Sequence, residues 1–162
     1  MKTIIVYYSL EGNTEYAANQ IAEVIGADLL RIMPKKAYPT NGLRKFLWGG
    51  KSAVMGETPE LLPYHFDASA YDRIIIGFPV WAGNFAPPIR TYLLNNNLHD
   101  KHIAAFACQS GAGAEKALSR LRVCLGIESF EAELVLIDPK DKPNEDNTQK
   151  ILDFCTKLSN SQ

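Results

Sequence analysis

Short apolar runs rich in β-branched residues alternate along the whole chain with stretches whose apolar residues recur at helical spacing. The strand-like runs lie at residues 3–8, 27–32, 73–78, 102–108 and 131–137. The helix-like stretches lie within residues 13–25, 87–93, 114–125 and 151–158. Strands interleaved with helices form a parallel sheet with right-handed crossovers and helices on both faces. The pattern therefore predicts an α/β fold built on a single doubly wound, five-stranded parallel sheet.

One segment, residues 34–67, interrupts this alternation. It is too long for a simple connection, and it contains two aromatic residues, Tyr38 and Trp48, among several glycines and prolines. We expect a long irregular or partly helical insertion, with room for a helix within residues 41–55. Because 162 residues are about the length of one domain, we expect residues 1–162 to form a single domain that carries this insertion.

Charge and cysteine content exclude several classes of function. Seventeen basic and eighteen acidic residues leave a net charge of -1, which indicates no partnership with nucleic acid or an anionic membrane. The three cysteines form no C-x-x-C pair, which argues against a disulfide framework and favours the cytoplasm. The three histidines show no metal-ligand spacing. The longest apolar stretch, residues 74–83, is about half as long as a membrane span requires, and no signal-peptide pattern opens the sequence.

The loop from Ser9 to Thr14 follows the first predicted strand and runs directly into a helix. Ligands bind such sheets beyond the carboxyl ends of the strands, so this loop belongs to the expected ligand edge. Free N–H groups at the start of a helix and the positive end of its dipole hold phosphate, and Gly12 permits a close approach. The loop contains no lysine or arginine, as suits a monophosphate bound without Mg²⁺. The alternative is that Asn13 or Thr14 simply caps the helix.

A second loop, residues 77–88, follows the third predicted strand at the same edge. Trp81 is a large flat ring between Pro79 and Gly83, and such a ring on a rigid loop suits contact with an aromatic ligand. Gly83 and Asn84 offer polar groups for ring heteroatoms. The alternative is that Trp81 packs beneath the loop as part of the core.

A third loop of small residues follows the strand at 102–108. Ser110 and its neighbours would let a ligand approach the backbone, although a plain strand-to-helix turn would have the same composition. Cys108 ends the strand at the ligand edge without a helper histidine, so an inert buried thiol and a redox-active thiol both remain open. Cys124 and Cys155 fall on predicted inner helix faces, where we expect them in the core.

Three other nucleotide or phosphate signatures each lack residues that they require. Residues 49–52 resemble the end of a Walker A loop, but Lys45 takes the place of its first glycine. Lys116 takes the place of the third glycine of a dinucleotide fingerprint that would start at Gly111. A phospho-receiver domain would need carboxylates where Ser9 and residues 78–79 stand.

Taken together, the three loops resemble those of the flavodoxin family, whose members bind FMN. Residues 8–14 are similar to the phosphate loop of that family, and residues 78–84 and 109–113 are similar to the loops that sandwich the isoalloxazine ring. The resemblance covers essentially the whole chain, with residues 34–67 matched least, and it implies strand order 2-1-3-4-5 with FMN as cofactor. It assigns Ser9, Glu11, Gly12, Asn13 and Thr14 to the phosphate. It assigns Pro79, Val80, Trp81, Gly83 and Asn84 to one side of the ring, and Ser110, Gly111 and Gly113 to the other.

Two departures from the family pattern bear on function. Electron-carrier flavodoxins are typically strongly acidic, and they usually place in the third loop an aromatic side chain that this chain lacks. An uncovered flavin face suits hydride transfer from NAD(P)H to a quinone-like acceptor, since the cofactor does the redox chemistry and the protein sets access. Three hypotheses stay open: an electron-transfer flavodoxin with a partner protein or small acceptor, an FMN-dependent NAD(P)H:acceptor reductase, and a non-redox binding module with a decayed flavin site.

The missing third-loop aromatic also directs attention to the inserted segment. We expect Trp81 to cover one face of the ring and Tyr38 or Trp48 to form a mobile lid over the other. The alternative for Trp48 is an ordinary core position, because it lies beside Phe46 and Leu47 in a stretch with amphipathic character.

Overall fold

The computed structural model describes residues 1–40 and 42–161, apart from the side chains of residues 42, 45 and 46. Asn41, where the sequence placed the start of a helix, lies outside the described residues. The strands are β1 (Thr3–Tyr7), β2 (Asp28–Arg31), β3 (Arg73–Trp81), β4 (Asn84–Phe85), β5 (His102–Gln109) and β6 (Glu133–Ile137). The helices are α1 (Asn13–Ile25), α2 (Gly42–Val54), α3 (Pro87–Asn95), α4 (Ala114–Leu125) and α5 (Glu145–Asn160), with a 3-10 turn at Ala68–Ala70.

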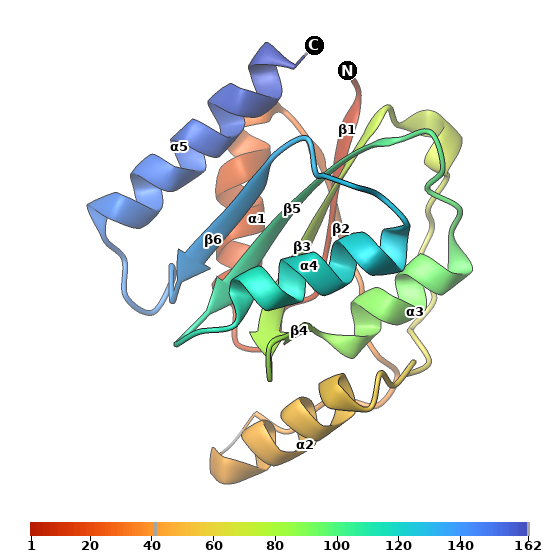
Figure 1. The fold of residues 1–162 in the computed structure, drawn as a ribbon, viewed down its shortest axis with the longest axis vertical. Helices are drawn as coiled ribbons and strands as arrows, with labels where there is room; N and C mark the ends of the chain where they lie inside the picture. Colours follow the sequence, from red (N-terminus) through yellow and green to blue (C-terminus); the bar gives the residue numbers. More distant parts are fainter. Residues whose placement is uncertain (41, 162) are drawn as a thin grey trace.

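The long strands form one parallel sheet of order β2-β1-β3-β5-β6. Counting only these parallel strands along the chain, the order is 2-1-3-4-5, so the predicted topology is confirmed. Helices α1 and α5 cover one face of the sheet, and α3 and α4 cover the other (Figure 1). The doubly wound α/β architecture is therefore also confirmed.

The strands are continuous apolar runs because both of their faces are buried. In β1, Ile4 and Val6 pack toward α3 and α4, whereas Ile5 and Tyr7 pack toward α1 and α5. A sheet covered on both sides has no solvated face, and its strands need no polar alternation. The carboxyl ends of β1, β3 and β5 consequently meet at one edge, where the three predicted loops begin.

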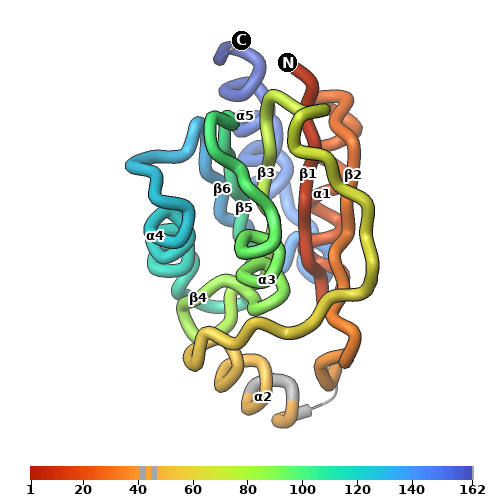
Figure 2. The backbone as a smooth tube through the Cα atoms, turned by 90° about the vertical axis from the view of Figure 1, so that its right-hand side faces the viewer, coloured from red at the N-terminus to blue at the C-terminus, as the bar shows by residue number. Residues whose placement is uncertain are grey.

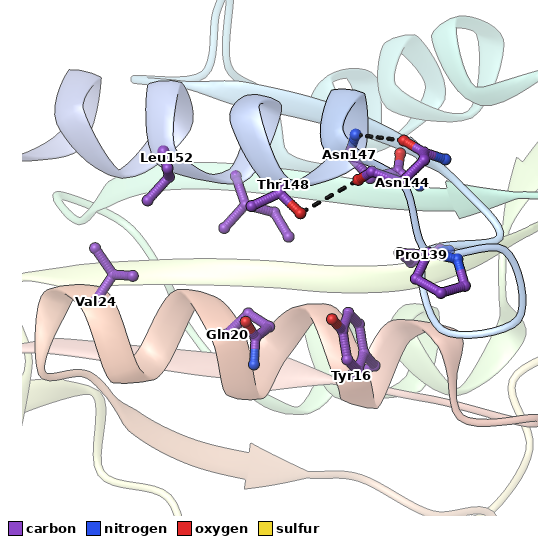
Figure 3. Close-up of a pocket in the computed structure, with 10 residues that line it drawn as sticks. Tyr16, Gln20, Val24, Pro139, Asn144, Asn147, Thr148 and Leu152 are labelled. Carbon is purple, nitrogen blue, oxygen red and sulfur yellow. Dashed lines mark hydrogen bonds between the residues drawn. The ribbon is translucent and has the colours of Figure 1, made fainter.

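Packing of α1 against α5 leaves only a small cavity of about 60 Å³ (Figure 3). Asn144, which lines this cavity, caps the first turn of α5: its carboxamide oxygen accepts a hydrogen bond from the Asn147 backbone amide at 2.8 Å. Val24 of α1 lines this cavity and is 52% exposed. That volume has room for a few water molecules and is far below the usual size of a cofactor site.

β4 is a difference from the sequence prediction, which treated residues 77–88 as a loop after a strand ending at residue 78. β3 continues to Trp81 and pairs with β4 through Val80–Phe85 and Trp81–Asn84. The two residues between the strands, Ala82 and Gly83, have φ angles of 50° and 66°. Positive φ at both central positions is the signature of the tight type I′ hairpin turn. The second loop is therefore a hairpin.

The segment at residues 34–67 holds α2, which lies across the carboxyl end of the sheet (Figures 1 and 2). Pro34, before α2 in the sequence, and Leu61, after it, form an isolated antiparallel bridge. The two ends of the segment therefore lie side by side. Small residues of α2 face the body of the protein: Gly49, Ser52 and Ala53 are buried. The large apolar side chains that the structure describes on α2 point away from the body and are exposed: Leu43, Leu47, Trp48 and Val54, followed by Met55.

One of the two cysteines expected in the core is buried, and the other is not. Cys108 and Cys155 are buried, but Cys124 is exposed, so its expected core position is wrong. Cys124 lies at the border of the buried face of α4. That face is formed by Ala117, Leu118 and Leu121, among others. Among the described residues, no helix is both long and apolar enough to cross a membrane.

Candidate functional site

The three predicted loops meet around a cavity of about 430 Å³ at the carboxyl edge of the sheet. We call it the sheet-edge cavity, and its volume is within the usual range for cofactor sites. The predicted site residues that line it are Ser9, Glu11, Asn13, Thr14, Pro79, Val80, Trp81, Ser110 and Gly111. The sequence did not assign Leu10, Gly50, Ala82, Cys108, Gln109, Ala112 and Asp138, which also line it. The other predicted site residues, Gly12, Gly83, Asn84 and Gly113, do not line it.

The loop before α1 forms a compact cradle around the Ser9 hydroxyl. Ser9 Oγ accepts hydrogen bonds from the backbone amides of Gly12 and Glu15, each at 3.2 Å. Thr14 Oγ1 is buried on the cavity wall and has no hydrogen-bond partner in the described part of the chain. A buried hydroxyl without a partner costs free energy unless a ligand satisfies it. The cradle therefore offers a donor group to an anion at the start of α1.

Gly12 is required for the path of this loop. Its φ is 100°, in the left-handed region, and it stands at the position before the first residue of α1. A Cβ atom added there would lie 2.9 Å from Lys140 Nζ. Both the backbone conformation and the nearby lysine therefore favour glycine.

Lys140 and Asp141 are parts of the site that sequence reasoning missed. The Asn13 carboxamide oxygen accepts from the Lys140 amide at 2.9 Å, and its nitrogen donates to Asp141 Oδ2 at 2.7 Å. This places Lys140 Nζ 3.1 Å from the carbonyl oxygen of Glu11, to which it donates. The chain separates these partners by 127 residues. The loop that lacks a cation in sequence thus acquires one from the connection after β6.

Arg31, at the end of β2, supplies a second positive charge behind the same loop. Its guanidinium donates to the Ser9 carbonyl oxygen at 3.3 Å and forms an ion pair with Glu15 at 2.7 Å. The Glu15 carboxylate balances this charge, so Arg31 acts mainly to hold the loop in place.

Trp81 forms one wall of the cavity and belongs to an aromatic cluster. Its ring meets Tyr8 edge-on with centroids 5.7 Å apart, and Tyr38 with centroids 5.0 Å apart. A Cβ atom at Gly49 of α2 would come within 3.2 Å of the Trp81 ring. The glycine in α2 thus permits the close packing that fixes the tryptophan.

Gly83 and Asn84 support the hairpin and do not line the cavity. Asn84 is buried, and its amide nitrogen donates to the Ala53 carbonyl oxygen at 2.9 Å, which ties α2 to the hairpin. Arg120 of α4 donates to the Gly83 carbonyl oxygen at 3.0 Å. A Cβ atom at Gly113 would lie 3.0 Å from Gly83 Cα, so the second and third loops touch through their backbones.

The third loop is fixed by polar contacts at both ends. Ser110 donates to Asp138 Oδ1 at 2.6 Å, and Lys142 pairs with the other carboxylate oxygen at 2.8 Å. The Gln109 side-chain oxygen accepts from the Ala114 amide at 2.9 Å, which caps α4. Asp138 is buried with a φ of 42°. The buried carboxylate therefore orients Ser110 at the mouth of the cavity.

Cys108 contributes an inert surface to the cavity floor. Burial raises the pKa of its thiol to about 12, and the nearby Thr14 hydroxyl acts in the opposite direction, without hydrogen-bond geometry. A thiol with this pKa stays protonated at neutral pH and is a poor nucleophile. The buried, inert interpretation of Cys108 fits this environment better than the redox-active one.

The two candidate lid residues occupy different environments. Tyr38 packs against Trp81 and Tyr8, and its hydroxyl lies 3.2 Å from Ser52 Oγ. Trp48 is 59% exposed, so its alternative assignment to the core is wrong. Neither side chain lines the sheet-edge cavity.

Comparison with known proteins places this architecture in a family. A family model described as flavodoxin matches residues 2–135. A flavoprotein from Lactobacillus acidophilus, solved in complex with FMN, is 25% identical, with a TM-score of 0.71 over 86% of this chain and 95% of that one. A flavodoxin from Streptococcus pneumoniae and flavodoxin 2 from Bacillus cereus share the fold over 100% of both chains. Their identities are 18% and 20%, and their TM-scores are 0.58 and 0.63. The family match spans most of the sequence, including all three cavity loops, and on that ground the chain belongs to the flavodoxin family.

Proposed function

We propose that this chain binds FMN in the sheet-edge cavity and passes electrons between partners as a flavodoxin-like redox protein. The observation that carries the proposal is the unpartnered, buried Thr14 hydroxyl at the start of α1, beside the Ser9 cradle. Family membership and the FMN complex of the Lactobacillus acidophilus protein support the choice of ligand. Bound FMN would supply the reversible redox chemistry that no side chain of this cavity can provide.

The residues divide by the part of the cofactor that they suit. The cradle of Ser9, Asn13 and Thr14 would hold the phosphate through hydroxyl groups and the first amides of α1. Trp81 and Val80 on the hairpin, with Gly111 in the third loop, would enclose the ring. The inert Cys108 thiol would form part of the floor without competing for electrons.

A second candidate function, an FMN-dependent NAD(P)H:acceptor reductase, is favoured by one feature of the third loop. The residues of this loop that line the cavity are Gln109, Ser110, Gly111 and Ala112, none of which carries a ring. A ring edge open on that side would give a nucleotide or a small acceptor direct access. Stopped-flow mixing of the FMN-loaded protein with NADH and NADPH separates the two functions. Rapid bleaching of the flavin absorbance supports the reductase, and its absence with intact single-electron exchange supports the carrier.

The test of FMN binding compares FMN with riboflavin, which lacks the phosphate. Thr14→Val removes the hydroxyl and keeps the shape, so it should weaken FMN about tenfold or more, as the loss of a hydrogen bond to a charged group predicts. Riboflavin affinity should stay unchanged. The measurement is the quenching of flavin fluorescence on titration with flavin-free protein.

Thr156→Val is the matched control, because Thr156 is exposed on α5 and donates only to a carbonyl of its own helix. It should leave both affinities unchanged. Equal losses for FMN and riboflavin in Thr14→Val would assign Thr14 a structural role. A wild-type chain that binds neither flavin would leave the decayed binding module as the better description.

A further inference from the structure

A second cavity, of about 560 Å³, lies beside α2 on the inserted segment. We call it the α2 cavity. Its lining residues are Lys36, Ala37, Tyr38, Pro39, Arg44, Trp48, Glu57 and Pro59. In the described part of the chain it shares no lining residue with the sheet-edge cavity. Its volume alone is enough for a ligand with two or three fused rings.

The walls of the α2 cavity suit a flat aromatic ligand. Tyr38 is held by its contact with Trp81 and by the Ser52 hydroxyl, so its ring is fixed in position. The Trp48 ring is exposed in the described structure, although tryptophan side chains are on average largely buried. Pro39 and Pro59 add rigid apolar surface. Two aromatic side chains and two prolines can bind a planar ring at low entropic cost.

The charges of the α2 cavity favour an anion. Lys36 and Arg44 form no ion pair with any described residue, whereas the Glu57 carboxylate already accepts a hydrogen bond from the Ser52 hydroxyl. Burial raises the pKa of Tyr38, so the phenol stays neutral and adds no negative charge at physiological pH. The ionisable side chains of the lining are therefore two cations and one carboxylate, a net positive charge beside aromatic walls. Arginine in particular combines a charge for an acidic group with a plane for stacking.

We infer that the α2 cavity binds a planar aromatic anion, a fused-ring compound that carries a carboxylate or sulfonate. The inference goes beyond the proposed function, because binding in the α2 cavity requires no flavin in the sheet-edge cavity. The two cavities meet through one aromatic contact, since Tyr38 of the α2 cavity packs against Trp81 of the sheet-edge cavity at 5.0 Å between centroids. A ligand bound there lies next to the flavin site and leaves that site free.

The probe for this inference is anthraquinone-2-sulfonate, with the neutral anthraquinone-2-sulfonamide as its uncharged counterpart. Calorimetric titrations with the FMN-loaded protein and with the flavin-free protein measure both affinities. Trp48→Ala should weaken both probes about tenfold, because stacking and apolar contact are lost together. Lys36→Gln and Arg44→Gln should each weaken the sulfonate about two- to fivefold, as expected for exposed charge pairs, and leave the sulfonamide unchanged.

Lys157→Gln is the matched control, since Lys157 is an exposed cation in the last turn of α5, on the other face of the sheet. It should leave the affinity of the sulfonate unchanged. The inference is overturned if FMN displaces the sulfonate, which would place the probe in the sheet-edge cavity. It is also overturned by affinities that none of the three α2-cavity variants changes, or by no binding up to about 1 mM. FMN titration of the same preparations reports separately on the proposed function, so failure of one does not imply failure of the other.

Discussion

The loops of the sheet-edge cavity and the segment that carries α2 are built in opposite ways. Each cavity loop is short and is held by partners far away in sequence, as Asn13 is by Lys140 and Gly113 by Gly83. The α2 segment is long, and α2 turns small residues toward the body and large apolar ones toward solvent. Its attachments are few and specific, such as the Asn84 amide bond to Ala53.

This difference indicates a division between a rigid cofactor frame and an adaptable neighbour. A frame with close backbone contacts cannot absorb an added atom, because packed interiors resist overpacking. A helix that exposes leucine and tryptophan has little packing to lose when those side chains change. Recognition of a partner can therefore vary on α2 while the cofactor frame stays constant.

The largest effect is expected where an added methyl meets backbone. Gly113 and Gly56 both have positive φ, but a Cβ at Gly113 meets the Gly83 backbone at 3.0 Å, whereas one at Gly56 approaches nothing closer than 3.7 Å. Gly113→Ala should lower the free energy of unfolding by about 2–4 kcal/mol, combining left-handed strain with overpacking. Gly56→Ala should cost only the strain, about 1–2 kcal/mol. Urea denaturation measures both, and equal losses would mean that the two regions are equally tolerant.

A smaller effect is expected for the cation that the fold brings to the phosphate loop. Lys140→Gln should weaken FMN about two- to fivefold at low salt, with riboflavin unaffected, because the lysine is exposed and its charge is screened. The difference from wild type should shrink as salt is added. Lys157→Gln serves again as the distant control in the same fluorescence titration. A loss that persists at high salt would show that Lys140 shapes the loop through its bond to the Glu11 carbonyl.

The smallest effect is expected on the outer face of α2. Leu47 is 68% exposed, and Leu47→Ala should change the free energy of unfolding by no more than about 0.5 kcal/mol. The reference is Leu118→Ala in α4, where loss of a buried leucine should cost about 2–5 kcal/mol. Thermal or urea unfolding followed by circular dichroism compares the two. A substantial loss at Leu47 would show that α2 is packed against another surface in solution.

Much of the fold could be predicted because its signals are local. The runs at 73–78 and 102–108 are strands since apolar, mostly β-branched or small residues fill both faces of a covered sheet. The expectation of FMN, drawn from the loop after β1 and its two companions, is supported by the family match and by the neighbour solved with FMN. The hairpin at residues 82–83 escaped prediction because alanine rarely adopts a positive φ.

The rest depended on contacts that a sequence does not display. Lys140 and Asp141 are 127 and 128 residues from Asn13, and no periodicity connects them. Cys124 lies beside the buried stripe of α4, where apolar character alone does not decide whether a side chain faces the core or solvent. Trp48 was assigned to a lid or to the core because an aromatic side chain gives no sign of pointing outward.

The Asn13 side chain has a consequence for how the protein acquires its cofactor during synthesis. During synthesis Asn13 is made 127 and 128 residues before its partners Lys140 and Asp141. Until Lys140 and Asp141 have been made, the loop before α1 has neither the two hydrogen bonds of the Asn13 carboxamide nor the contact of Lys140 with the Glu11 carbonyl oxygen. The phosphate cradle is thus complete only after the connection that follows β6 has been made, so flavin capture that depends on the Asn13 contacts must follow synthesis of that connection.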